Sequence, residues 1–201
     1  MRRNETMQVL GLTGGVGMGK STADSILRRW GIPVVDTDVL ARDLVAPGQP
    51  ALQEIRAAFG PEVLDPSGEL RRGALAERVF TDPEARQRLE SILHPRIRRL
   101  WRAQVADWSV SGQHPVAVVV IPLLFETGAE REVDATICVA CSPATQRQRL
   151  RERGWSDRQI DARIASQWPV SRKIELATYV VWTEGSLEVH EQQLARILRN
   201  Y

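Results

Sequence analysis

Residues 14–22 read Gly14-Gly15-Val16-Gly17-Met18-Gly19-Lys20-Ser21-Thr22 and match the pattern G-x-x-x-x-G-K-[ST]. The stretch follows the apolar residues 8–12 and precedes a helix-like segment over residues 21–30, which is closed by Gly31-Ile32-Pro33. Between a strand and a helix, glycines allow successive backbone N–H groups to turn inward around a phosphate. We therefore predict that this loop binds the phosphates of a nucleotide.

The composition singles out Lys20 within the loop. The chain of 201 residues contains 25 Arg but only 2 Lys. An ammonium is a compact point charge, whereas the planar fork of Arg does not fit inside such a loop. We expect Lys20 to reach the β- and γ-phosphates and Ser21 to offer its hydroxyl to Mg²⁺, with the following helix adding the positive end of its dipole.

The remaining composition excludes several classes of protein. With 43% hydrophobic and 26% charged residues, the chain is expected to be globular, with one core or a core and an inserted subdomain. The net charge of +2 does not argue for nucleic acid. The longest apolar stretch, residues 116–125, is too short for a bilayer, and residues 1–6 lack an apolar signal region. We expect a cytoplasmic monomer or weak homo-oligomer that does not bind membranes.

The two cysteines, Cys138 and Cys141, form one C-x-x-C pair in a strand-like apolar run. A redox pair belongs at a helix N-terminus, and a zinc site needs further ligands. The chain has no second C-x-x-C, and its three His are scattered. We interpret both thiols as buried packing residues.

Short apolar runs alternate with helix-periodic segments along the chain. This alternation favours an α/β fold in which helices cover both faces of a parallel sheet and the nucleotide lies at the carboxyl ends of the strands. We expect the strands at residues 9–12, 34–35, 116–121, 135–140 and 179–182.

Some 80 residues separate the second expected strand from the third, far more than one crossover helix needs. Helical patterns cover most of this interval, at residues 39–45, 51–59, 73–80 and 83 to about 108. The segment Asp65-Pro66-Ser67-Gly68 formally matches the D-x-x-G of GTPases, but no N-K-x-D follows, so we predict a turn. We expect residues 46–111 to form a helical insertion for a second substrate, and residues 1–45 and 112–201 to form the nucleotide-binding core.

The densest charge run is Arg147-Gln148-Arg149-Leu150-Arg151-Glu152-Arg153. On a helix, Arg149 and Arg153 share one face, and Arg147 and Arg151 share another. The run is either a solvated helix or part of a mobile lid that brings guanidinium groups to a transferring phosphoryl group. A possible hinge at Gly154-Trp155-Ser156 and a helix-like segment after it favour a lid over residues 147–172.

Three further segments carry candidate chemistry. Asp36 and Asp38 close the second strand, where a carboxylate can accept a proton from an attacking hydroxyl, help to hold Mg²⁺, or cap the next helix. The residues alone do not decide between these roles or between the two Asp. His94 precedes Pro95 and is more typical of a turn or packing residue. Glu126 follows a proline break after an apolar run, which makes it a weak Walker-B candidate.

Taken together, these segments resemble the dephospho-CoA kinase family. The resemblance rests on the order and spacing of residues 11–22, 35–38 with Ala41-Arg42, 45–52, Leu93-His94-Pro95, 122–126, and Arg163-Ile164 with Gln167. It implies a P-loop kinase core similar to that of nucleoside-monophosphate kinases, with a helical substrate-binding insertion and a helical lid. It also implies transfer of the γ-phosphoryl group of ATP to the 3′-hydroxyl of dephospho-CoA, the last step of coenzyme A synthesis.

The resemblance further implies a role for each matching residue. Asp38 would be the general base and, with Lys20 and Arg149, would carry catalysis, while Ser21 would meet Mg²⁺. The acceptor side would be lined by Asp38, Arg42, His94, Glu126 and Arg163. ATP would be bound by Gly15, Val16, Gly17, Met18, Gly19, Lys20, Ser21, Thr22, Arg149 and Arg153.

The sequence departs from the family pattern at several positions. Met18 replaces a small polar residue, Thr37 replaces Ala, and Ile121 replaces Val. Residues 177–185 lack the usual Asp and Asn, so no side-chain role in the adenine pocket is carried over to them. Two other functions remain open at this point: a nucleoside or nucleoside-monophosphate kinase, and a regulatory or assembly protein that hydrolyses ATP slowly without an acceptor.

Overall fold

The computed structural model describes residues 7–201, which form two compact units. The first unit runs up to Asp36 and resumes with Val105–Tyr201, and the second unit is Thr37–Gln104. The expectation about a signal region falls on residues 1–6, which lie outside the described residues.

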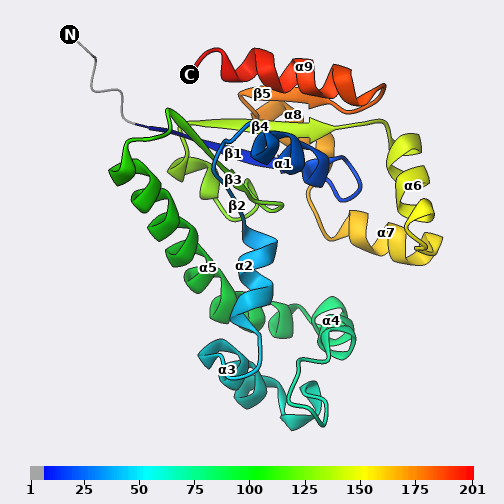
Figure 1. Ribbon diagram of the computed structural model, residues 1–201. Coiled ribbons are helices and arrows are strands. Elements are labelled where there is room, and N and C mark those ends of the chain that lie inside the picture. Colours follow the sequence, from blue (N-terminus) through cyan, green and yellow to red (C-terminus); the bar gives the residue numbers. More distant parts are fainter. Residues whose placement is uncertain (1–6) are drawn as a thin grey trace. The chain divides into compact units, whose positions relative to one another are not determined.

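The first unit is built on a five-stranded parallel sheet with the order β2-β3-β1-β4-β5 (Figure 1). Apolar residues run continuously through its central strands because both faces of the sheet are covered. β1 is the middle strand and pairs along its length with β3 and β4. This sheet confirms the expected fold class. The strands are β1 (Gln8–Gly14), β2 (Val34–Asp36), β3 (Val116–Val120), β4 (Ala135–Ala140) and β5 (Tyr179–Trp182).

Helices pack on both faces of this sheet. Leu10 and Leu12 point to the face covered by α1 and α9, where they join Leu27 and Leu194 in one buried cluster. Thr13 points to the opposite face, where its hydroxyl donates to the Pro122 carbonyl at 3.1 Å. Lys173 of α8 donates to the same carbonyl at 2.7 Å, which places α8 on that face. The layers are therefore α/β/α, as predicted.

Serine side chains cap two helices of the first unit. Ser142 and Ser156 each accept a backbone N–H of the helix that follows, and Ser156 forms a capping box with Gln159. These helices are α1 (Lys20–Arg29), α6 (Pro143–Glu152), α7 (Asp157–Ala165), α8 (Val170–Leu176) and α9 (Leu187–Leu198), with a 3₁₀ turn η2 (Ala129–Glu132).

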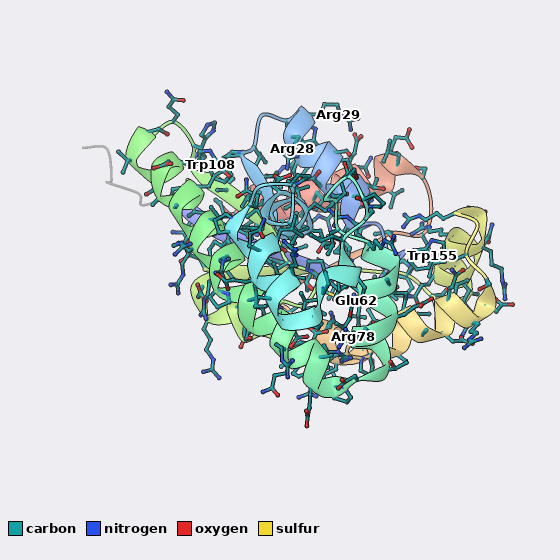
Figure 2. The ribbon with its side chains drawn as sticks, turned by 90° about the horizontal axis from the view of Figure 1, so that it is seen from below. Arg28, Arg29, Glu62, Arg78, Trp108 and Trp155 are labelled. Atoms are coloured by element: carbon teal, nitrogen blue, oxygen red, sulfur yellow. The ribbon has the colours of Figure 1, made fainter. Side chains whose placement is uncertain are left out.

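The second unit is helical and has its own buried core, centred on Leu52, Ile55 and Phe59. Arg78 lies over the Phe59 ring. It also pairs with Glu62, and both residues of this pair are labelled in Figure 2. Its elements are α2 (Thr37–Leu44), α3 (Pro50–Phe59), a 3₁₀ turn η1 (Pro61–Val63), α4 (Arg72–Thr81) and most of α5 (Pro83–Ser111).

Two local predictions in the second unit have different outcomes. Asp65 accepts hydrogen bonds from the N–H groups of Ser67 and Glu69, so the D-x-x-G match is the predicted turn. Of the two alternatives for His94, a turn or a packing residue, the turn is excluded, because His94 and Pro95 lie inside the continuous helix α5, as the expected helix over residues 83–108 requires. Pro95 removes one backbone donor there, and the Arg96 side chain donates to the Ile92 carbonyl at 2.5 Å in the same turn.

The boundaries of the second unit differ from those of the expected insertion, residues 46–111. The unit starts at Thr37 because α2 follows β2 without a connecting loop and packs against α3. It ends at Gln104 because the last turns of α5 belong to the first unit. Helix α2 therefore belongs to the helical unit and not to the unit that contains the sheet.

Within the part of the chain that the structure describes, no helix has the length and apolar character needed to cross a bilayer.

Candidate active site

The loop between β1 and α1 has backbone conformations that require glycine. Gly14, Gly17 and Gly19 have φ values of 147°, 76° and 98°. A Cβ atom on Gly14 would lie 2.3 Å from the Val139 carbonyl oxygen of the neighbouring strand. The loop therefore tolerates no side chain at Gly14, and its backbone follows the path that a phosphate-binding loop needs.

Lys20 and Ser21 open helix α1 at the end of this loop. The Lys20 ammonium donates to the carbonyl oxygens of Gly14 and Gly15 at 2.7 and 2.9 Å, so it lies folded over the loop. Ser21 and Thr22 are exposed in the first turn, and Met18 is buried. Met18 thus contributes to the loop through its backbone, which agrees with the expectation for that position.

Two glutamine side chains hold the loop at Val16. Gln146 of α6 donates to the Val16 carbonyl at 2.7 Å, and the Val16 N–H donates to the Gln167 side chain at 3.0 Å. Gln167 follows Ser166, the residue that caps the C-terminal end of α7. The carbonyl of this loop residue is therefore fixed from α6, just before the predicted lid, and its N–H is fixed from within the predicted lid.

Thr183, which follows β5, connects the loop to Arg149. Its hydroxyl donates to the Met18 carbonyl at 3.0 Å and accepts from the Arg149 guanidinium at 2.9 Å. Arg149 also donates to the Thr183 carbonyl at 2.6 Å. Two hydrogen bonds from one guanidinium fix its orientation, which prepares a positive charge beside the loop.

A pocket of about 210 Å³ lies beside the phosphate loop. It brings together Arg149 and Arg153 with three of the loop residues predicted to bind ATP. The rest of its wall comes from the β5–α9 connection and the start of α9. The lining residues are Gly17, Gly19, Thr22, Arg149, Arg153, Thr183, Gly185, Ser186, Leu187 and His190.

The other arginines of the charge run serve a different contact. Arg147 and Arg151 pair with Asp161 and Asp157 of α7, at 2.5 and 2.9 Å. These exposed pairs contribute little stability, but they join α6 to α7. The two helix faces predicted from the spacing are therefore real, and one faces the pocket while the other faces α7.

Arg163 lies on α7, and its guanidinium is 6.0 Å from the centre of the Trp155 ring. Figure 2 marks Trp155 in the connection between α6 and α7. Gly154 in the same connection has a φ of 83°, which a glycine adopts without strain. Arg163 is not among the residues that line the pocket beside the phosphate loop.

Glu126 forms a buried ion pair that the sequence did not predict. Its Oε1 lies 2.8 Å from Lys173 Nζ and accepts the Trp168 N–H at 3.0 Å, while its Oε2 is buried without a hydrogen-bond partner among the described residues. Lys173 is fully buried and is the second lysine of an arginine-rich chain. The scarcity of lysine that singled out Lys20 could also have drawn attention to Lys173.

The remaining predicted acceptor residues belong to the second unit. Asp36 ends β2 and occupies the position before α2 at which capping residues are found, whereas Asp38 is an exposed residue within the first turn. Arg42, one turn later, donates to the Asp38 carbonyl at 3.2 Å. His94 is half-buried on α5. Helix capping therefore suits Asp36 better than Asp38.

Cys138 and Cys141 are both buried and free. Burial raises the pKa of the Cys138 thiol to about 11, and burial also raises the pKa of Cys141. Thiols held in this protonated form are unreactive, which agrees with their interpretation as packing residues.

The hydrogen bonds to the Glu184 carboxylate, just after β5, predict that the protein loses stability in acid. Hydrogen bonds from Ser142, and then from Thr145, lower the pKa of Glu184 from 4.5 to about 2. The folded chain thus keeps a carboxylate that the unfolded chain protonates first, and its stabilising effect is complete above pH 4.5 and lost as the pH falls toward 2. We expect the melting temperature of the wild type to fall more steeply across this range than that of Glu184→Gln.

Thermal unfolding of both proteins at a series of pH values measures this difference. Glu175→Gln is the control for the removal of one carboxylate, because Glu175 is exposed on α8, outside the hydrogen bonds that Glu184 accepts from Ser142 and Thr145. Parallel curves for the wild type and Glu184→Gln would show that these hydrogen bonds do not stabilise the folded carboxylate.

A phosphate loop between the first strand and first helix of this parallel sheet, facing two arginines of α6, defines a P-loop kinase. The sequence profile described as dephospho-CoA kinase matches residues 8–188. The chain belongs to the dephospho-CoA kinase family, and it is a kinase. The reaction for which this family is named completes coenzyme A biosynthesis.

Individual relatives agree with this assignment. A dephospho-CoA kinase of Anaeromyxobacter dehalogenans is 47% identical over 193 residues, which cover 96% of this chain and 91% of the relative. The crystal structure of TT1252 from Thermus thermophilus is 36% identical with a TM-score of 0.84, covering 96% of this chain and 97% of the other. A dephospho-CoA kinase from Campylobacter jejuni shares the fold, with a TM-score of 0.69, 23% identity and 96% coverage of both chains.

Proposed function

We propose that this chain transfers the γ-phosphoryl group of ATP to the 3′-hydroxyl of the ribose of dephospho-CoA, giving coenzyme A and ADP. Membership of the family supports the reaction. The binding of ATP as the phosphoryl donor is supported by the pocket in which the phosphate loop faces Arg149 and Arg153. Phosphoryl transfer depends mainly on positioning and on charge stabilisation, which this combination of backbone N–H groups and cations supplies.

On the donor side, we propose that the loop N–H groups and Lys20 hold the β- and γ-phosphates. In the described structure Lys20 donates to two loop carbonyls, and a phosphate would replace these acceptors. Arg149 is held in place by Thr183 and would stabilise the negative charge on the transferring group. Arg153 is exposed at the pocket and would approach the same phosphates.

The residues of the site fit Mg²⁺ bound together with the nucleotide. Mg²⁺ prefers hard oxygen ligands and usually combines one or two protein oxygens with phosphates and water. The Ser21 hydroxyl is exposed in the first turn of α1, directly after Lys20, and would supply such an oxygen. When bound, the ion would neutralise charge on the phosphate oxygens.

On the acceptor side, we propose Asp38 as the general base. As the 3′-oxygen bonds to phosphorus and the bond to the β-phosphate oxygen breaks, the hydroxyl proton would pass to the Asp38 carboxylate. Arg42, His94, Glu126 and Arg163 remain predicted acceptor ligands. The helical segment of residues 46–111 would hold the acceptor, and residues 147–172 would act as a lid.

The decisive experiment compares acceptors. Phosphoryl transfer from ATP should be measured with dephospho-CoA, with a panel of nucleosides and nucleoside monophosphates, and without an acceptor. We expect the highest kcat/KM for dephospho-CoA. A preference for a nucleoside or nucleotide would replace dephospho-CoA by another acceptor, and ATP hydrolysis unaffected by any acceptor would contradict transfer to dephospho-CoA.

The remaining expectations stay predictions. They are a cytoplasmic location, a monomer or weak homo-oligomer, and no binding of nucleic acid.

A further inference from the structure

His190 is a buried polar residue whose Nε2 atom has no hydrogen-bond partner among the described residues. It lies on the first turns of α9, and only 5% of its surface is exposed. The same residue lines the pocket beside the phosphate loop. A buried nitrogen without a partner costs stability, so an unpaired one at the wall of a ligand pocket requires an explanation.

The charge state of His190 restricts what it can bind. Burial and then the positive charge of Arg149 lower its pKa, while Glu191 raises it by a smaller amount. The imidazole is therefore neutral near pH 7 and is a weak ligand for phosphate. A neutral imidazole still offers one hydrogen-bond donor and one acceptor, as the edge of a nucleobase does.

The pocket is divided between two kinds of wall. Gly17, Gly19 and the two arginines lie on the side where phosphates are expected. The other side is formed by the β5–α9 connection and α9, where Leu187 supplies an apolar side chain beside His190. Thr183 and Ser186 add two hydroxyls to this wall, and an apolar side chain beside uncharged polar groups suits a flat heteroaromatic ring.

The size of the pocket agrees with this division. Its volume of about 210 Å³ is below the roughly 300–1,000 Å³ of sites that enclose a whole drug-sized ligand. It therefore has room for part of a nucleotide. With the phosphates at the glycine loop, the part left for the α9 side is the base.

We propose that His190 recognises the base of the bound nucleoside triphosphate through a hydrogen bond at Nε2. This inference takes from the proposed function only that the donor is ATP, and it does not depend on the acceptor. The wall of the pocket continues from the β5–α9 connection to His190 on α9. Recognition of the base in this chain thus includes His190 of helix α9.

The test compares His190→Leu with the wild type in the binding of ATP and of inorganic tripolyphosphate, by calorimetry without an acceptor. Tripolyphosphate carries the phosphates without the base. We expect the affinity for ATP to fall about fivefold to tenfold, which corresponds to one hydrogen bond, and the affinity for tripolyphosphate to stay unchanged. An equal loss for both ligands, or no loss for either, would overturn the proposal.

Val189→Ala is the matched control, because Val189 is exposed on the same helix and does not line the pocket. It should bind both ligands as the wild type does. Thermal unfolding without ligand checks the fold, and we expect His190→Leu to be as stable as the wild type or more stable, because it removes an unpaired buried nitrogen. Because no acceptor is present, failure of dephospho-CoA as the substrate would leave this binding result intact.

A second measurement needs no folded variant at position 190. In wild-type protein labelled with ¹⁵N-histidine, the Nε2 signal of His190 should shift when ATP is added and not when tripolyphosphate is added. His94→Gln and His114→Gln identify the other two rings, since the chain has three His. A signal that responds equally to both ligands, or to neither, would count against a contact with the base.

Discussion

Replacing Asp38 by Asn should lower kcat with dephospho-CoA by about 10²- to 10⁴-fold and leave ATP binding nearly unchanged. An amide of the same shape cannot accept the proton of the attacking hydroxyl. Asp38 is exposed within the first turn of α2, so the fold does not depend on burying its carboxylate. Steady-state kinetics with dephospho-CoA, together with calorimetric titration of ATP, measures both parts of the prediction.

Two other carboxylates of the same region serve as controls. Asp43→Asn removes an exposed charge from the same helix and should retain most of the activity. Asp36→Ala removes the side chain at the capping position before the helix, and its effect should appear mainly as a lower melting temperature. If Asp38→Asn turned over at the wild-type rate, Asp38 would not be the general base.

Replacing Lys173 by Met should lower the free energy of unfolding by about 3–5 kcal/mol. The ammonium is fully buried and touches two oxygens, Glu126 Oε1 at 2.8 Å and the Pro122 carbonyl at 2.7 Å. Removing it leaves the Glu126 carboxylate in the protein interior without a counter-charge. Urea unfolding at pH 7, followed by circular dichroism, gives the free energy directly.

A double variant separates the loss of the pair from the loss of packing. Lys173→Met with Glu126→Gln removes both charges, so it should be more stable than Lys173→Met alone. Glu175→Gln removes an exposed charge from the same helix and should change stability by less than about 0.5 kcal/mol. An unfolding curve of Lys173→Met that overlaps the wild-type curve would show that the pair does not stabilise the fold.

The sheet could be predicted because its signal is local. Continuous apolar runs such as residues 116–120 and 135–140 are typical of strands that are covered on both faces, and both became central strands. The phosphate loop was equally predictable, since its glycines and Lys20 are adjacent in sequence. The spacing of Arg149 and Arg153 placed them on one helix face, and both line the pocket.

The residues that shape the loop could not be predicted in this way. Gln146 and Gln167 bond to Val16 across 130 and 151 residues of sequence, and Thr183 bonds to Met18 across 165 residues. No local pattern encodes such contacts, because they exist only after the sheet brings the segments together. The role proposed for His190 could not be predicted for the same reason, because its unpaired nitrogen is evident only once the pocket is assembled.

At Pro95, a strong local signal against a helix is overruled by the helix around it. Proline in a helix costs about 3 kcal/mol or more, which is why a turn was one of the two alternatives for His94. The flanking residues of the 29-residue helix α5 form enough regular hydrogen bonds and packing to continue through it. Tertiary context decides such positions, and the helical periodicity over residues 83–108 was the better guide.

The two hydrogen bonds at Val16 change where the phosphate loop should be sensitive to mutation. They use only the N–H and carbonyl groups of residue 16, which every amino acid except proline provides. The shape of the loop at this point is therefore determined by the partners Gln146 and Gln167 and is independent of the Val16 side chain. Natural variation should accordingly be freer at residue 16, inside the signature, than at two glutamines far outside it.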